Sequence, residues 1–174
     1  MSRKLKNEEL HRLSMEEFTQ AAKKPIVVVL DNVRSLHNVG SVFRSADAFL
    51  IDEILLCGLT GCPPNKEIEK TALGATNTVK WQYFDSTQKA IDYLKSKKIP
   101  VYAVEQAENS IPLNKMPFPK ACALVFGNEV YGVEQDIVDI CDGVIEIPQL
   151  GSKHSLNISV SAGIVLWEVL RGDL

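Results

Sequence analysis

Apolar and polar positions along this chain alternate in blocks that favour strands and helices in turn. Short apolar runs such as PIVVVL (25–30) and ACALVF (121–126) are typical of strands buried on both faces of a parallel sheet. Between such runs, apolar residues recur at the spacing of amphipathic helices. The pattern predicts strands at 25–30, 52–58, 77–84, 99–106, 121–129 and 143–148, and helices at 7–22, 38–50, 66–73, 85–97, 133–141 and from Ile158 onward.

This repeated alternation of strands and helices indicates an α/β domain with a largely parallel sheet flanked by helices. Residues 58–67 and 108–120 are rich in proline and are predicted loops. We expect an N-terminal helical extension over residues 1–24, in which Ser14 and Glu17 form a capping box, and one domain over residues 25–174.

Composition narrows the class of protein. The chain has 174 residues, of which 45% are hydrophobic and 24% charged, as in one soluble domain. No apolar run is long enough to cross a bilayer and no secretory leader opens the chain, so we expect no membrane association and a cytoplasmic location. Four cysteines without CxxC spacing argue against disulfides and structural zinc, and we expect no metal.

The net charge of −3 argues mildly against a nucleic-acid partner, because phosphate binding usually leaves a basic surface. The charge is uneven, however. Residues 1–24 hold six Lys or Arg against four Glu, a balance of +2, which leaves −5 on the remainder. The segment could be a basic arm, although a solvated helix face is the commoner interpretation.

Three predicted strand-to-helix loops carry polar residues that the fold alone does not require. In open α/β sheets such loops meet at the carboxyl edge of the strands, where ligands bind. The first loop carries Asn38 and Arg44, and the second carries Gly127 and Glu129. The third places a cluster of polar side chains at the start of one helix, where a single cap would suffice. This cluster consists of Ser152, His154, Ser155, Asn157 and Ser159.

Each of these residues also has a structural explanation. Asn38 could cap its helix, and Glu129 could be a carboxylate favoured at a helix start. Arg44 lies among apolar residues of its predicted helix, so we expect a mostly buried side chain with an anionic partner. The convergence of three loops favours a common site. The motifs GxGxxG, GxxxxGK[ST], GxSxG and HExxH are absent from the sequence, which disfavours dehydrogenases, P-loop NTPases and α/β-hydrolases.

Three segments, in order, resemble the signature motifs of the SpoU (TrmH) family of RNA ribose 2′-O-methyltransferases in the SPOUT superfamily. They are NVRSLHNVGSVFRSADAF (32–49), LVFGNEVYGV (124–133) and IPQLGSKHSLNISVSAGIVLWE (147–168). The resemblance implies an α/β fold whose C-terminal part is threaded into a trefoil knot, with S-adenosylmethionine as cofactor. It also implies RNA as substrate, tRNA more than rRNA, and a homodimer whose active site uses both copies.

The resemblance also assigns roles to residues of this chain. Asn38 and Glu129 would orient Arg44, and Gly127 would lie where a side chain would clash with the cofactor. Arg44 would be either the general base or a charged group that grips phosphate and stabilises the developing alkoxide. The implied catalytic residues are Arg44, Asn38, Glu129, Ser155 and Asn157, and the implied cofactor-binding residues are Glu105, Gly127, Ile147, Ser155 and Leu156.

Two other functions fit the sequence. A non-catalytic RNA-binding module could keep the fold, although its polar motif residues would then have no purpose. A methyltransferase for a small molecule would suit the acidic charge. The sequence leaves the modified nucleotide, and any need for a partner protein, open.

Overall fold

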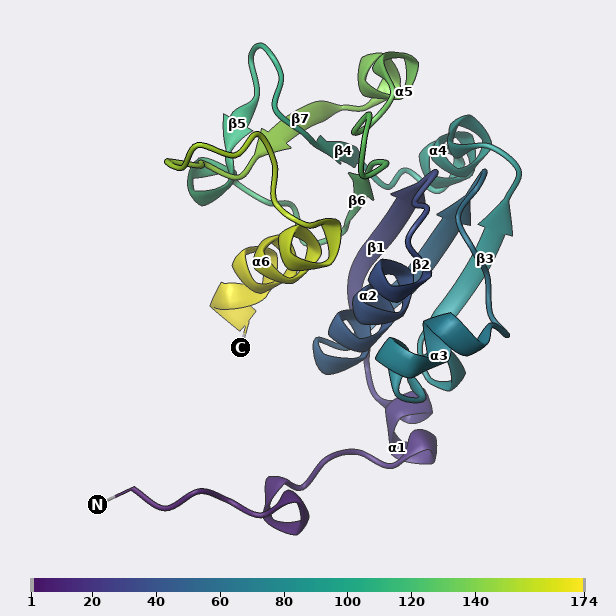
Figure 1. Ribbon diagram of the computed structural model, residues 1–174, viewed down its shortest axis with the longest axis vertical. Coiled ribbons are helices and arrows are strands. Elements are labelled where there is room, and N and C mark those ends of the chain that lie inside the picture. Colours follow the sequence, from purple (N-terminus) through teal and green to yellow (C-terminus); the bar gives the residue numbers. More distant parts are fainter. Residues whose placement is uncertain (1, 174) are drawn as a thin grey trace.

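The computed structural model describes residues 2–173 and is built on one seven-stranded sheet (Figure 1). The strand order is β3-β2-β1-β6-β4-β7-β5, and all paired neighbours are parallel. The expected α/β class with a parallel sheet is therefore confirmed. The strands are β1 (Lys24–Asp31), β2 (Ile51–Cys57), β3 (Lys80–Phe84), β4 (Val101–Val104), β5 (Ile111–Pro112), β6 (Cys122–Phe126) and β7 (Gly143–Glu146). Of these, β5 lies inside a segment predicted as a loop.

The order of the strands creates a switch point at the middle of the sheet. The chain moves outward from β1 through β2 to β3, crosses to β4 and β5, and returns so that β6 lies between β1 and β4. Val28 of β1 thereby pairs with Leu124 of β6, far away in sequence. Loops that diverge at such a point leave a crevice at the carboxyl ends of the strands.

Helices cover both faces of the sheet and build two apolar cores. One core joins the sheet to α1, α2, α3 and α6, and the other joins it to α4 and α5. The α-helices are α1 (Met15–Gln20), α2 (Leu36–Ala48), α3 (Lys66–Ala72), α4 (Thr87–Ser96), α5 (Gln135–Ile140) and α6 (Ile158–Leu170). The short 3-10 helices are η1 (Asn7–Leu10), η2 (Ala75–Asn77), η3 (Leu113–Lys115) and η4 (Arg171–Asp173).

The N-terminal segment differs from the single helix predicted over 7–22. Only η1 and α1 are helical, and a bend separates them because the capping box of Ser14 and Glu17 starts a new helix. Figure 1 shows the chain before α1 running away from the sheet. Phe18 is buried and joins α1 to the core.

The start of α2 also differs from the expected one. Ser35 is the N-cap, with an extended backbone and an Oγ that accepts a hydrogen bond from the Asn38 N–H at 3.3 Å. Asn38 is therefore not the cap but the third residue of the helix, and it is buried. Its side-chain amide is free for other contacts.

Within residues 2–173, no helix combines the length and apolar character needed to span a bilayer. In the same range, no three His, Cys, Asp or Glu side chains converge as metal ligands would. The knotted threading and the boundary at residue 24 stay predictions.

Candidate active site

A cavity of about 440 Å³ opens at the carboxyl ends of β4, β6 and β7, beside the switch point of the sheet. Three loops line it: residues 105–106 after β4, residues 127–132 after β6, and parts of residues 147–157 before α6. Its volume lies within the range of small-molecule sites. The second and third motifs therefore meet at one hollow, as the parallel topology predicts.

A chain of hydrogen bonds joins all three motifs at the edge of this cavity. Glu129 Oε1 accepts from Asn38 Nδ2 at 3.1 Å, and Asn38 Oδ1 accepts from Asn157 Nδ2 at 3.1 Å. Asn157 Oδ1 in turn accepts from the N–H of Ser159 at 2.9 Å and so caps α6. Because an ionised carboxylate can only accept, Glu129 fixes which way both amides face.

Glu129 is held by the start of α2. Its carboxylate accepts from the backbone N–H groups of Arg34 at 3.0 Å and Ser35 at 2.9 Å. These donors lie where the partial positive charge of a helix N-terminus favours an anion. Partial burial raises the pKa of Glu129, but the hydrogen bonds from Arg34, Ser35 and Asn38 outweigh it and leave the pKa below its ordinary value.

The turn that carries Glu129 is held by its own backbone and by Asn128. Asn128 and Gly132 exchange two backbone hydrogen bonds of 2.9 Å each. Asn128 Oδ1 accepts from the N–H of Val130 at 2.8 Å, and Asn128 Nδ2 donates to the carbonyl of Asn32 at 2.8 Å. The turn is thus anchored to the loop after β1.

The close packing of this turn explains Gly127. A Cβ atom built there would lie 2.1 Å from the carbonyl carbon of Gly132 and from the nitrogen of Val133. A side chain at position 127 would therefore clash with the protein's own backbone even when no cofactor is bound. Gly132 has a φ of +69°, and a Cβ there would lie 2.1 Å from Glu105 Oε2. Both glycines are required by the turn itself.

Glu105 and Gln106 form another wall of the cavity. The Glu105 carboxylate accepts from the N–H of Val133 at 3.0 Å and from that of Gln106 at 2.8 Å. Gln106 Nε2 donates to the carbonyl of His154 at 2.5 Å and so ties the third motif to the end of β4. Ile147, Ser155 and Leu156 also line the cavity.

Arg44 is placed differently from expectation. It lies on the outer side of α2 and is exposed, and it is not among the residues that line the cavity. The apolar neighbours Val42 and Phe43 are fully buried, so Arg44 occupies the solvent side of an amphipathic helix. Within residues 2–173, Glu129 and Asn38 bond to each other and not to Arg44. The prediction that Arg44 is mostly buried beside an anionic partner is therefore wrong for the single chain.

The cavity suits a molecule that is apolar at one part and cationic at another. Val104, Phe126 and Ile158 supply apolar walls, while Glu105 and Glu129 supply carboxylates. Carboxylates at the wall favour a cationic ligand by charge. The adenine ring and sulfonium of S-adenosylmethionine match these two properties, so the residues present fit that cofactor.

Comparison with known proteins identifies the family of the chain. The model of the SpoU rRNA Methylase family matches residues 25–167, and the chain belongs to that family. It is similar to the tRNA (guanosine(18)-2′-O)-methyltransferase of Thermus thermophilus, with 31% identity over 166 residues, which are 95% of this chain and 84% of that relative.

Two solved structures share the fold and part of the sequence. An S-adenosylmethionine-bound rRNA methyltransferase from Sinorhizobium meliloti aligns with a TM-score of 0.82 and 27% identity over 90% of this chain and 60% of the other. A TrmH/SpoU tRNA modifying enzyme from A. aeolicus aligns with a TM-score of 0.80 and 28% identity over 90% of this chain and 81% of the other. The expected family is thus confirmed, and with it S-adenosylmethionine-dependent methyl transfer.

Sequence reasoning missed the residues that hold the site in shape. Asn32 has a left-handed backbone, with φ of +53°, and Gln106 bridges two loops. Asp31 is buried, and its Oδ1 accepts from Asn32 Nδ2 at 3.0 Å. Asn32 opens the first motif and Asp31 lies directly before it, and that position was the available signal. Gln106 had no signal in the sequence.

Proposed function

We propose that this chain transfers a methyl group from S-adenosylmethionine to a ribose 2′-hydroxyl of RNA, with tRNA as the substrate, and that it works as a homodimer. The observation that carries the proposal is the hydrogen-bonded chain Glu129–Asn38–Asn157, which joins the three motifs at one cavity. The T. thermophilus relative, named for tRNA ribose methylation, supports tRNA as the substrate.

The cofactor would lie in the cavity, held by groups that already face it. Backbone groups of Ile147 and Leu156 would hold the adenine, and Glu105 the ribose hydroxyls, with Gly127 and Ser155 beside them. When bound, S-adenosylmethionine supplies an electrophilic methyl group. The protein's part is to hold a ribose oxygen in line with that methyl, since alignment contributes most to such a displacement.

Asn38, Asn157 and Glu129 would fix the position of the ribose. Their amides are held in one orientation by the Glu129 carboxylate, so little reorganisation is needed when RNA arrives. Ser155, which lies on the same loop as Asn157, would contact the ribose or the cofactor.

Arg44 would complete the site from a second copy of the chain. Its exposed position on α2, outside the cavity, supports a role across an interface. A guanidinium keeps its proton at any physiological pH, so the charged form would grip a phosphate and stabilise the developing alkoxide. The alternative, Arg44 as the general base, needs a deprotonated guanidinium.

The surface of α6 supports a homodimer. The helix is apolar nearly all round, and the sheet covers only part of it. Its exposed side carries three large apolar residues: Val160 (50% exposed), Ile164 (39%) and Trp167 (52%). Beside them lies a second hollow of about 660 Å³, lined mainly by apolar side chains such as Phe49 and Leu113. Ile147 lines both this hollow and the cavity, so a second copy seated on α6 would lie next to the active site.

The decisive experiment maps ribose methylation. Total RNA from cells with and without the gene should differ at one or a few tRNA nucleotides, and the purified protein should restore those methyl groups with S-adenosylmethionine alone. Loss of methylation in rRNA instead would overturn the tRNA assignment. If RNA is unchanged and a metabolite is methylated, the protein is a small-molecule methyltransferase. If nothing is methylated, the non-catalytic RNA-binding module is favoured.

A further inference from the structure

Tyr131 is a large aromatic side chain with no evident structural role. It is 81% exposed, and its neighbour Val130 is 65% exposed, at the outer end of the turn after β6. Tyr131 nevertheless lines the mouth of the active-site cavity. An exposed aromatic group contributes little to the apolar cores, and exposed aromatics beside a site are typical of ligand contacts.

The backbone that presents Tyr131 is held firmly. Asn128 Oδ1 accepts from the Tyr131 N–H at 3.3 Å, and the two hydrogen bonds between Asn128 and Gly132 close the turn on either side of it. Glu129 ties the same turn to α2. A tyrosine on a fixed backbone has only two side-chain torsions to restrict, so it can bind a flat partner at little cost in entropy.

The surroundings favour a nucleobase as that partner. The cations Arg34 and Lys153 are exposed on two of the loops at the site: Arg34 precedes α2 and its backbone N–H binds Glu129, and Lys153 lies on the loop before α6, which lines the cavity through Ser155 and Leu156. Cations flanking an aromatic group are the usual arrangement for binding single-stranded nucleic acid. Because a base is bonded directly to its ribose, a ribose that reaches the cavity brings its base to the site.

We propose that Tyr131 stacks on the base carried by the ribose that is methylated. The proposal rests on the proposed RNA methyltransferase function and adds a substrate class, the unpaired nucleotide. In a duplex both faces of a base are covered by its neighbours, so Tyr131 could stack only on a base in a loop or at an end. Because every base has a flat face, Tyr131 would select for unpaired nucleotides and not for base identity.

The test uses the full-length protein and the tRNA fraction that the wild-type protein methylates. Tyr131→Ala and Tyr131→Leu should weaken tRNA binding, measured with S-adenosylhomocysteine present, by roughly 5- to 150-fold. Tyr131→Phe and Tyr131→Trp should stay within about threefold of wild type, because both keep an aromatic face. Affinity for S-adenosylhomocysteine alone should stay unchanged in all four.

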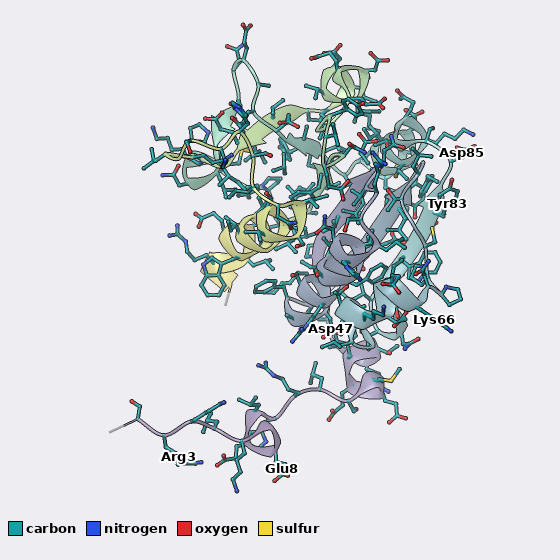
Figure 2. All side chains as sticks on the ribbon, viewed as in Figure 1. Arg3, Glu8, Asp47, Lys66, Tyr83 and Asp85 are labelled. Carbon is teal, nitrogen blue, oxygen red and sulfur yellow. The ribbon has the colours of Figure 1, made fainter. Side chains whose placement is uncertain are left out.

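Tyr83→Ala is the matched control. Tyr83 is 51% exposed on β3, and Figure 2 shows it at the edge of the molecule away from α6. Its replacement should leave tRNA binding unchanged. In a second measurement, a complementary strand is annealed over the methylated nucleotide. This should abolish the difference in tRNA affinity between wild type and Tyr131→Ala.

Several outcomes would overturn the stacking role. These are unchanged tRNA affinity in Tyr131→Ala, equal loss in Tyr131→Phe, weakened S-adenosylhomocysteine binding, or dissociation of a dimer. They are distinct from failure of the proposed function, in which the wild-type protein itself methylates no RNA.

Discussion

At the scale of single residues, Glu129 links the fold to the site because its carboxylate both satisfies the start of α2 and orients Asn38. Its pKa is lowered in the folded protein. Above about pH 4.3, the usual pKa of an unfolded glutamate, the carboxylate is ionised in both states and its contribution to stability is complete. That contribution should fall as pH drops through the folded pKa, where the native carboxylate also takes up a proton.

Glu129→Gln should remove this pH dependence. The difference in unfolding free energy between wild type and variant should be largest at pH 7 and shrink as the pH falls from about 4.3 toward 3, which urea titrations at several pH values would measure. Glu16→Gln is a suitable control, because Glu16 is exposed on α1, does not line the cavity, and has no hydrogen-bond or ion-pair partner within residues 2–173. A difference that stays constant with pH would contradict the assigned role.

The motif residues could be predicted from the sequence because they stand in three recognisable segments that follow predicted strands, but their exposure could not. Glu129, Asn38 and Asn157 were expected together and do lie together. The exposure of Arg44 depends on which side of α2 faces the sheet, and the neighbouring apolar residues suggested the wrong side. The reason for a glycine at position 127 could not be predicted either, because it depends on how closely the backbone of Gly132 approaches in the folded turn.

At the scale of elements, Asn157 couples the start of α6 to the start of α2. Asn157→Ala should remove the cap on Ser159, which costs about 1 kcal/mol of stability. It should also leave Asn38 Oδ1 without its donor, at a further cost of about 1–3 kcal/mol. Chemical denaturation would measure the sum.

Ser86→Ala provides the comparison for that measurement. Ser86 caps α4 through the N–H of Lys89, away from the cavity, so its loss should cost only about 1 kcal/mol. Equal losses in the two variants would show that the bond between Asn38 and Asn157 adds nothing.

Helices and strands could be predicted well wherever the spacing of apolar residues within one segment determines its secondary structure. Every predicted strand forms, and the helix expected over 85–97 forms as α4. The errors are the unexpected strand β5, the single helix predicted over 7–22, and element ends such as Ser35, a serine three residues before Asn38 that takes the capping role. The strand order depends on contacts distant in sequence, such as Val28 with Leu124, which periodicity does not encode.

At the scale of the whole molecule, the exposed apolar face of α6 should hold two copies together. Ile164→Asp places a charge on this face without entering the core and should convert a dimer to a monomer in sedimentation at micromolar concentration. Leu73→Asp is the control, because Leu73 is 65% exposed and ends α3, a helix that Figure 1 shows apart from α6. A wild-type monomer would contradict the proposed assembly.

If Arg44 acts across that interface, two inactive variants should restore each other. Arg44→Ala keeps an intact cavity, whereas Gly132→Val keeps Arg44 but drives a side chain against Glu105. Each alone should have little or no methyl transfer, with Arg44→Ala still binding S-adenosylhomocysteine normally. Refolding the two together at equal amounts should recover roughly a quarter of wild-type activity, since half of the randomly paired twofold dimers are mixed and each has one complete site. If Arg44 serves the cavity of its own chain, every mixed dimer carries a defect in both sites and activity does not return.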